Sequence, residues 1–292
     1  MDLKLLEDAL ALLEEKTLSR AAARRNVTQP AFSRRIRALE DWAGVPLLER
    51  RANSVVLRAS LTENEAEIRT LLKRLSRLRG QIIAQGGRPQ TVVLATQHAL
   101  ATDVFASLLD RFQDSSPDLA LRLRTMNRED CISLFLHGEA DLLLCYEARD
   151  FPPLPFDASI ERRIWMRDTL IPVVGGSLRY RIDGDGGTGK ALPLVGYPQS
   201  SHFGRLIERT GLNEPFVQEG GWVRVESAFT LGVLELIRSG VGLGWIPQSM
   251  CRRDLAAGNL VSLAGRHGSI PLDISLFAPN DNQPALDLVD DI

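Results

Sequence analysis

Residues 18–37 constrain the fold of this chain more than any other stretch of the sequence. They predict two short helices, the first over about residues 19–25 and the second after a turn at residues 26–27. Thr28 is suited to cap the second helix. Pro30 stands in its first turn, where the N–H that proline lacks would have no helical partner. The pattern therefore predicts a helix-turn-helix.

The second of these helices separates apolar from polar side chains. Phe32, Ile36 and Leu39 recur at helical spacing and predict a buried stripe. The polar side chains on the other faces belong to Gln29, Ser33, Arg34 and Arg37. Glutamine can bond an adenine edge and arginine a guanine edge, so such a helix suits the major groove of DNA. The alternative is a charged face that is merely solvated.

The charge of the chain is unevenly distributed. Residues 1–90 carry 17 Lys and Arg against 11 Asp and Glu, a net charge of +6, whereas the remainder carries −8. A basic N-terminal module on an acidic body favours a polyanionic partner for that module alone.

A hairpin is expected directly after the helix-turn-helix. Residues 44–51 and 54–57 predict two short strands, with Arg50 and Arg51 near the tip of a wing. Basic wing tips commonly contact phosphates or the minor groove.

These motifs together resemble the LysR-type transcriptional regulators. The residues that carry the resemblance are Ala21 and Ala22, Val27 to Ser33, Ile36 to Glu40 and Gly44 to Arg50. The resemblance implies an α/β protein: an N-terminal winged helix-turn-helix plus a linker helix, then a periplasmic-binding-protein-like effector domain of two α/β subdomains. It also implies a dimer of dimers on promoter DNA. Residues 32–40 and 204–210 look similar to the hypochlorite-responsive subgroup of this family.

The DNA-binding residues follow from the helix pattern, the wing and the resemblance. We expect Ser33, Arg34 and Gln29 to contact base edges, and Arg37, Arg50 and Arg51 to contact phosphates. The complete predicted set is Ser19, Thr28, Gln29, Pro30, Ser33, Arg34, Arg37, Arg50 and Arg51.

A linker helix is expected over residues 60–87. Its apolar residues alternate at spacings of three and four, as in a coiled coil: Ile68, Leu71, Leu75, Leu78 and Ile82. A seam this short needs a partner helix, which predicts a homodimer. The alternative is an amphipathic helix that packs on its own domain.

The rest of the chain alternates strands with helices, which predicts a largely parallel sheet. We divide the chain into a winged helix-turn-helix at 1–59, the linker helix at 60–87 and an effector-binding domain at 88–292. Its subdomain I covers about 91–158 and 265–292, and its subdomain II about 159–264. The chain ends at Ile292, earlier than we expect for a final helix.

Ligands of open α/β sheets bind beyond the carboxyl ends of the strands and at helix N-termini. The residues at such positions are Thr96, His98, Ala99, Thr102, Tyr146, Ser200, Ser201, His202 and Ser227. We expect them to line a cleft for a small-molecule effector, although the hydroxyls among them are also suited to cap helices.

The cysteines allow a second kind of signal. Cys145 lies in the predicted strand 141–146, beside the expected cleft, so its oxidation by an oxidant is one hypothesis for sensing, and a buried core thiol is the alternative. The three cysteines lie far apart, which argues against a disulfide framework or a zinc site.

Other functions have less support in the sequence. Residues 184–190 resemble a phosphate-binding loop, but Ala191 stands where a Ser or Thr must hold magnesium. We therefore expect no cofactor, no metal and no enzymatic activity. The sequence contains neither a signal peptide nor a transmembrane run, so we expect a cytoplasmic protein. The alternative function is a small-ligand binding protein whose N-terminal module serves oligomerisation only.

Overall fold

The computed structural model of the chain describes residues 2–51, 54–85, 91–101, 103–115, 119–183, 187 and 191–290. The chain divides into an N-terminal unit, residues 1–88, and a C-terminal unit, residues 89–292. Each unit has a hydrophobic core of its own.

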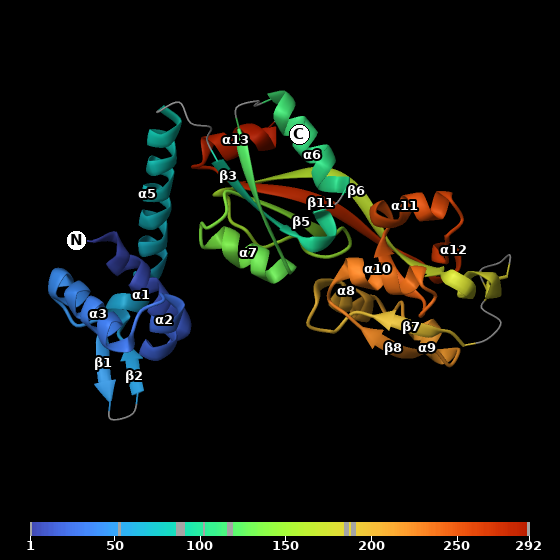
Figure 1. The fold of residues 1–292 in the computed structure, drawn as a ribbon, viewed down its shortest axis with the longest axis horizontal. Coiled ribbons are helices and arrows are strands. Elements are labelled where there is room, and N and C mark those ends of the chain that lie inside the picture. Colours follow the sequence, from blue (N-terminus) through green and yellow to red (C-terminus); the bar gives the residue numbers. More distant parts are fainter. Residues whose placement is uncertain are drawn as a thin grey trace. The chain divides into compact units, whose positions relative to one another are not determined.

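The N-terminal unit combines helices with a two-stranded hairpin (Figure 1). Its elements are α1 (Leu3–Glu15), α2 (Leu18–Arg24), α3 (Gln29–Ala43), β1 (Leu48–Arg51), β2 (Ser54–Leu57), α4 (Ala59–Thr62) and α5 (Glu65–Gln85). Thr17 caps α2, since its hydroxyl accepts a hydrogen bond from the Arg20 N–H at 3.3 Å. Thr28 occupies the N-cap position of α3, where its described side chain makes no capping hydrogen bond.

One buried carboxylate joins α1, α2 and α3. Asp8 of α1 is fully buried, and its two oxygens accept hydrogen bonds from Arg25 Nε at 2.7 Å and Arg35 Nη1 at 3.4 Å. Arg25 stands at the C-cap of α2 and Arg35 lies on α3. Because a buried carboxylate is costly without partners, these contacts favour one arrangement of the three helices.

Helix α5 is partly packed on its own unit. Ile68 and Leu72 contact the cluster formed by α1, α3 and α4. In contrast, Leu71, Leu78 and Ile82 are 41%, 51% and 61% exposed. One edge of the helix is therefore covered by its own unit, and three of the predicted seam positions face solvent.

The C-terminal unit is an α/β structure whose elements alternate along the chain (Figure 1). Its first elements are β3 (Thr91–Gln97), η1 (His98–Leu100), α6 (Asp103–Ser115), β4 (Ala120–Met126), α7 (Arg128–Leu136), β5 (Leu142–Ala148), β6 (Ile160–Gly175) and η2 (Gly176–Arg181). The others are β7 (Pro193–Gly196), α8 (His202–Thr210), α9 (Glu214–Gln218), β8 (Trp222–Glu226), α10 (Thr230–Arg238), β9 (Gly244–Pro247), α11 (Gln248–Ala256), β10 (Leu260–Ser262), α12 (Ala264–His267), β11 (Ile270–Pro279) and α13 (Gln283–Asp290). A final helix, α13, is thus present.

The main sheet has seven strands in the order β10-β6-β11-β5-β3-β4, with β9 also paired to β6. Strand β3 pairs in parallel with β4 and β5, whereas β11, β6, β9 and β10 are joined by antiparallel pairings. The expectation of a largely parallel sheet is therefore wrong for the described strands. The reason is that the two long strands β6 and β11 run antiparallel through the centre of the sheet.

Helices cover both faces of the β3–β4–β5 part of this sheet, and β5 distributes its side chains between them. Leu142, Leu144 and Tyr146 belong to the core beneath α6 and α13. Leu143 and Cys145 belong to the cluster beneath α7. This alternation is the period of two that a strand imposes when both of its faces are buried.

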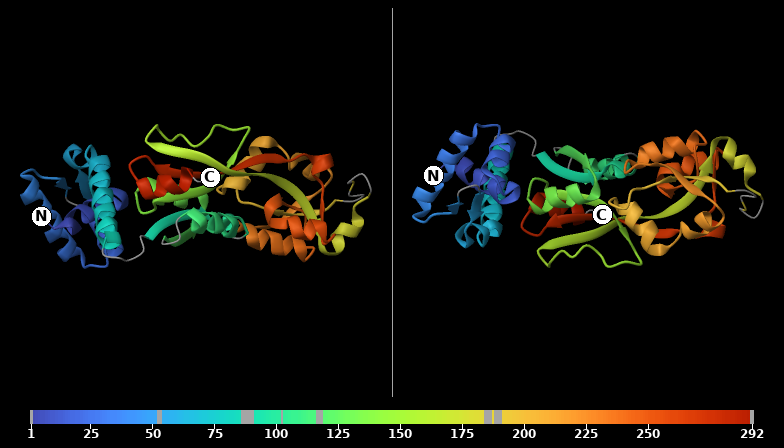
Figure 2. Two further views of the ribbon diagram at one scale, coloured as in Figure 1. Left: turned by 90° about the horizontal axis from the view of Figure 1, so that it is seen from above. Right: turned by 90° about the horizontal axis from the view of Figure 1, so that it is seen from below.

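The long strands β6 and β11 run from one group of elements to a second group and so connect them, as Figures 1 and 2 show. The first part of β6 pairs with β11, with Ile160 opposite Pro279 and Leu170 opposite Ile270. The last part of β6 pairs with β9 and β10. The elements β3–β5, α6, α7 and α13 form one lobe, and β7–β10 with α8–α12 form the other.

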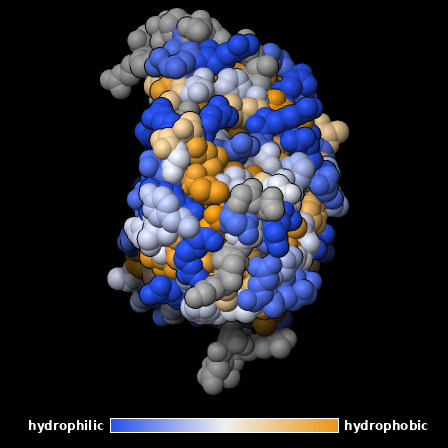
Figure 3. Space-filling view, turned by 90° about the vertical axis from the view of Figure 1, so that its right-hand side faces the viewer, coloured by the Kyte–Doolittle hydropathy of each residue, from blue (hydrophilic) through white to orange (hydrophobic). Residues whose placement is uncertain are grey.

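One face of the molecule is shown by its hydropathy in Figure 3. The face in Figure 3 is mostly hydrophilic, with an interrupted band of hydrophobic side chains. Among the described residues, no helix combines the length and apolar character that crossing a membrane requires.

Candidate nucleic-acid interface and ligand cavity

Helix α3 presents a polar face opposite its core contacts. Phe32, Ile36 and Leu39 are buried in the N-terminal unit, as the periodicity predicts. The predicted DNA-contacting residues on and beside α3 are solvent-accessible, with Ser33 half-buried and the others exposed: Ser19, Thr28, Gln29, Pro30, Arg34 and Arg37. An exposed row of hydrogen-bonding side chains on one helix has the geometry that base readout in a groove requires.

The wing places its basic residues beside its turn. Arg50 lies opposite Val55, and Arg51 lies opposite Ser54 in the last pair before the tip. The side chains of Arg50 and Arg51 lie outside the described part of the chain, so only their backbone positions are given.

Two arginines near this surface have a different role, which the sequence pattern did not reveal. Arg25 and Arg35 turn toward Asp8 and Glu7 instead of extending into solvent. Because the partner carboxylates lie on α1, far from α3 in sequence, periodicity along α3 alone does not separate Arg35 from its neighbour Arg34.

A cavity of about 300 Å³ lies in the C-terminal unit, where elements of both lobes meet. It is bounded by the end of β3, the beginning of α7, the loop after β7 and the first residues of α8 and α10. Its lining residues are Gln97, His98, Ala99, Met126, Asn127, Arg128, Glu129, Asp130, Tyr197, Ser200, Ser201, His202, Phe203, Ala228 and Thr230.

The structure brings part of the predicted effector set together in this cavity. The predicted residues that line it are His98, Ala99, Ser200, Ser201 and His202. The hydroxyl of Thr96 instead donates to the Leu144 carbonyl at 2.9 Å, inside the sheet. Tyr146 is buried beneath the cavity, and Ser227 Oγ accepts a hydrogen bond from the Phe229 N–H at 3.1 Å. Thr102 lies outside the described residues.

Thr96, Tyr146 and Ser227 therefore do not line this cavity. A residue at a strand end points to one face of the sheet or the other, and proximity to the end alone does not say which.

Four of the residues that were missed lie together at the beginning of α7. Asn127, Arg128, Glu129 and Asp130 follow directly after β4, which pairs in parallel with β3. Because carboxyl ends of parallel strands meet at one edge, the β4–α7 junction was an available signal. The other lining residues that were missed are Met126, Tyr197, Phe203, Ala228 and Thr230.

His202 of the cavity has a strongly shifted pKa. Burial lowers its pKa to about 3, and the charge of Arg128 acts in the same direction, so the imidazole is neutral at pH 7. Its Nε2 atom is inaccessible to solvent and has no hydrogen-bond partner among the described residues. Buried polar atoms without partners are rare in folded proteins.

An ion pair connects the two lobes at this cavity. Arg205 of α8 donates to the carboxylate of Glu129, which lies in the first turn of α7. The other guanidinium nitrogen of Arg205 donates to the Ser200 carbonyl at 2.5 Å. The position of one lobe relative to the other is therefore linked to the lining of the cavity.

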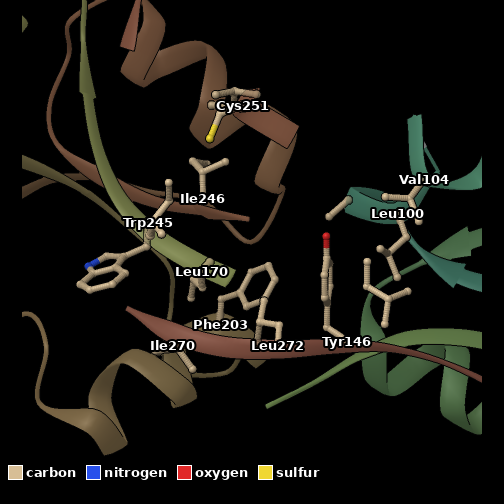
Figure 4. Close-up of a cluster of buried hydrophobic side chains, with 14 of the residues drawn as sticks. Leu100, Val104, Tyr146, Leu170, Phe203, Trp245, Ile246, Cys251, Ile270 and Leu272 are labelled. Carbon is tan, nitrogen blue, oxygen red and sulfur yellow. The ribbon is translucent and has the colours of Figure 1, made fainter. Parts of the chain in front are cut away.

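Aromatic rings support the cavity from below. The rings of Tyr146 of β5 and Phe203 of α8 lie side by side, with ring centroids 5.4 Å apart (Figure 4). The Tyr146 hydroxyl donates to Asp168 Oδ2 at 3.3 Å, and Asp168 also accepts a hydrogen bond from the Ser249 hydroxyl at 2.5 Å. These contacts hold Phe203, and with it the beginning of α8, against β5.

Gly204 allows α8 to begin close to the preceding loop. A Cβ atom at this position would lie 2.2 Å from the Pro198 carbonyl oxygen. Ser201 caps the helix, because its hydroxyl oxygen accepts a hydrogen bond from the Gly204 N–H at 3.1 Å.

The structure shows Cys145 as the buried core thiol that the sequence analysis gave as the alternative to an oxidant sensor. This thiol is fully buried on the α7 face of β5, beside Arg128 of the cavity lining, and burial raises its pKa to about 12. Since the thiolate is the reactive form of cysteine, a thiol with this pKa is a poor oxidant sensor.

A winged helix-turn-helix joined to a two-lobed α/β unit with a cavity between its lobes defines a DNA-binding regulator with an effector domain. Residues 3–64 match the family described as the bacterial regulatory helix-turn-helix protein, lysR family, and residues 85–289 match the LysR substrate binding domain. The chain therefore belongs to the LysR family of transcriptional regulators.

Individual relatives have the same organisation. The chain is 26% identical to the HTH-type transcriptional regulator YjiE of Escherichia coli, over 96% of this chain and 89% of YjiE. Full-length HypT of Salmonella typhimurium, a hypochlorite-specific regulator, matches with a TM-score of 0.58 and 24% identity, over 100% of this chain and 97% of HypT. DarR of Vibrio fischeri, solved in complex with DNA, matches with a TM-score of 0.56 and 24% identity over 100% and 99% of the chains. The last two likenesses concern the fold.

Proposed function

We propose that the chain places α3 in the major groove of promoter DNA and that its wing, the β1–β2 hairpin, contacts the neighbouring DNA backbone. Gln29, Ser33 and Arg34 would contact base edges, and Arg37 would contact phosphates together with Arg50 and Arg51. The exposed polar face of α3, opposite a fully packed apolar face, carries this proposal. The net charge of +6 on residues 1–90 supports it.

The assembly that acts on DNA is, in this proposal, a homodimer formed through the linker helix, residues 60–87, and then a dimer of dimers. The observation that supports it is the exposure of Leu71, Leu78 and Ile82 on α5. A second copy of α5 would remove these side chains from water, which stabilises an association by about 25 cal/mol per Å² of apolar surface. Such a regulator acts in the cytoplasm, where promoter DNA is found.

The signal enters, in this proposal, as a small molecule bound in the cavity of about 300 Å³. Residues of both lobes line it, among them His98 and Ala99 from one lobe and Ser200, Ser201 and His202 from the other. A ligand that contacts both lobes binds one of their arrangements better than the other and so shifts an existing equilibrium. This mechanism needs neither a cofactor nor a redox change.

The DNA contacts are tested with a duplex selected by the full-length protein from a randomised library. Binding of this duplex is compared at about 50 mM and about 200 mM salt for the wild type and for Arg34→Ala. We expect a steep loss of affinity with salt. For Arg34→Ala we expect a cost of about 1–3 kcal/mol on the selected sequence and a smaller one on unrelated DNA.

Arg122→Ala is the matched control, because Arg122 is an exposed arginine of β4 in the C-terminal unit. It should bind like the wild type. Binding that is insensitive to both salt and Arg34→Ala would contradict the proposed role of α3.

A further inference from the structure

One nearly buried arginine connects the linker helix α5 to the helix-turn-helix. The Arg69 side chain is 12% exposed, and its Nη2 atom contacts a carboxylate oxygen of Glu14 on α1 at 2.8 Å and one of Glu65 on α5 at 2.6 Å. We propose that this Arg69 clasp, formed by Arg69, Glu14 and Glu65, fixes the rotation of α5 on its own unit and thereby sets the spacing of the two DNA half-sites that a dimer selects. Arg69 is therefore a positioning residue for DNA binding, and this inference rests on the proposed dimer.

The Arg69 clasp lies on the covered edge of α5. Ile68 and Leu72, on either side of Arg69 in the sequence, pack against the apolar cluster of α1, α3 and α4. Apolar contacts are not directional, so by themselves they permit α5 to rotate in place. The hydrogen bonds of a planar guanidinium to carboxylates have a preferred geometry. The clasp therefore selects one rotation among those that the apolar contacts allow.

Glu14 offers Arg69 a fixed partner because it is held from two sides. One of its carboxylate oxygens contacts Arg69, and the other contacts Arg24 of α2 at 2.5 Å. The Glu14 side chain is 18% exposed, so little water competes for these contacts. The clasp thus connects α5 directly with α1 and, through Glu14, with α2, which belongs to the helix-turn-helix that carries α3.

The exposed seam positions of α5 lie on a different side of the same helix. Leu71 directly precedes Leu72, so the two side chains are about 100° apart around the helix axis. Leu72 contacts its own unit, whereas Leu71 is 41% exposed. A rotation of α5 on its unit therefore turns the seam by the same angle relative to α3. In a symmetric dimer both copies rotate, so the distance and the angle between the two α3 helices change by both contributions.

The distance between the two α3 helices decides which duplexes the dimer can bind. One additional base pair between the half-sites moves the second half-site by about 3.4 Å and rotates it by about 35° around the DNA axis. Two α3 helices that are held rigidly match one spacing, whereas two that can rotate match several. Spacing preference, and not affinity for a single half-site, is the property that the clasp controls.

The test varies the half-site spacing in the duplex that the full-length protein selects from the randomised library. Wild type and Arg69→Ala are titrated with duplexes of the selected spacing, of one or two base pairs more or fewer, and with one half-site scrambled. We expect the wild type to prefer its selected spacing to a spacing one base pair longer or shorter by about tenfold, and Arg69→Ala by about threefold or less. Affinities of the two proteins for a single intact half-site should agree within about twofold.

Two further variants separate positioning from other effects of the substitution. Arg69→Lys keeps the charge but loses the planar fork of the guanidinium, so its spacing preference should lie between those of the wild type and Arg69→Ala. Arg79→Ala is the matched control, because Arg79 is an exposed arginine on the same helix, and it should keep the wild-type preference. Light scattering should give the same mass for all four proteins, since the seam residues are unchanged.

Each contrary result overturns the proposal in a distinguishable way. An undiminished preference in Arg69→Ala, or an equal loss in Arg79→Ala, would show that the clasp does not set the spacing. A parallel loss of affinity for the single half-site and for every spacing would leave Arg69 a purely structural role. A smaller mass of Arg69→Ala would assign this arginine to the dimer interface instead. A wild type without any preferred spacing would refute the proposed dimer on DNA together with the clasp.

Discussion

Replacing Asp8 by asparagine should loosen the helix-turn-helix without changing its surface. Asp8 is fully buried and accepts hydrogen bonds from Arg25 and Arg35, whereas these arginines are themselves 27% and 36% exposed. A fully buried pair costs about 3–5 kcal/mol when one partner is removed. Since water reaches both arginines and asparagine keeps one acceptor oxygen, we expect a loss near the value of a charged hydrogen bond, about 2 kcal/mol.

Amide hydrogen exchange with mass spectrometry measures this loss within the full-length protein. Peptides from α1, α2 and α3 should exchange about 30-fold faster in Asp8→Asn, which corresponds to about 2 kcal/mol of local opening. Peptides from the C-terminal unit should not change. Affinity for the selected duplex should also fall, because α3 is held less firmly.

Glu7→Gln is the matched control for this prediction. Glu7 also pairs with Arg25, but its side chain is 47% exposed, and pairs at the surface contribute about 0–1 kcal/mol. If Asp8→Asn accelerates exchange no more than Glu7→Gln does, the buried carboxylate does not organise these helices, and the reasoning fails.

Three further predictions concern α5, the cavity and the cysteines. Leu78→Glu on α5 should shift full-length protein from dimer or larger toward monomer in light scattering, while an unchanged mass would place the interface elsewhere. The pKa of His202 is about 3 in the folded protein and near 6.5 in the unfolded chain, so protons bind the unfolded chain first as the pH falls. The free energy of unfolding, measured with urea, should therefore decrease between about pH 6.5 and pH 3, by up to about 1.4 kcal/mol per pH unit. His202→Asn should flatten this dependence, and equal slopes in both proteins would assign it to other groups. Burial raises the pKa of all three thiols to between about 11 and 12: Cys131, Cys145 and Cys251. A thiol reagent at neutral pH should therefore label the folded protein slowly and the urea-unfolded protein fully. Fast labelling of the folded protein would contradict this and favour oxidant sensing by the cysteines.

The N-terminal unit was the more predictable part because its signals are local. A cap, a proline in the first turn and the spacing of Phe32, Ile36 and Leu39 all lie within one short segment. The partners of Arg35 could not be predicted in the same way, because Asp8 is 27 residues away in sequence. Periodicity identifies which side of a helix is buried, but not which charge lies opposite.

The cavity was less predictable because it depends on strand pairing over long distances. Thr96 and His98 lie near the end of the same strand, yet Thr96 bonds to β5 within the sheet and His98 lines the cavity. The wrong prediction of a largely parallel sheet also arises from strand pairing over long distances. Strands β6 and β11 are more than 90 residues apart, and no local pattern states that they pair antiparallel.

The ion pair between Glu129 and Arg205 is too weak to hold the lobes together by itself. Its side chains are 47% and 41% exposed, so it contributes at most about 1 kcal/mol, which changes an equilibrium about fivefold. Moving two lobes from mainly open to mainly closed takes about 5.5 kcal/mol of differential binding. In the proposed mechanism a ligand would therefore have to supply most of this energy through contacts with both lobes, such as the beginnings of α8 and α10 in one lobe and Arg128 in the other. An effector that contacts a single lobe would bind without changing the arrangement of the lobes.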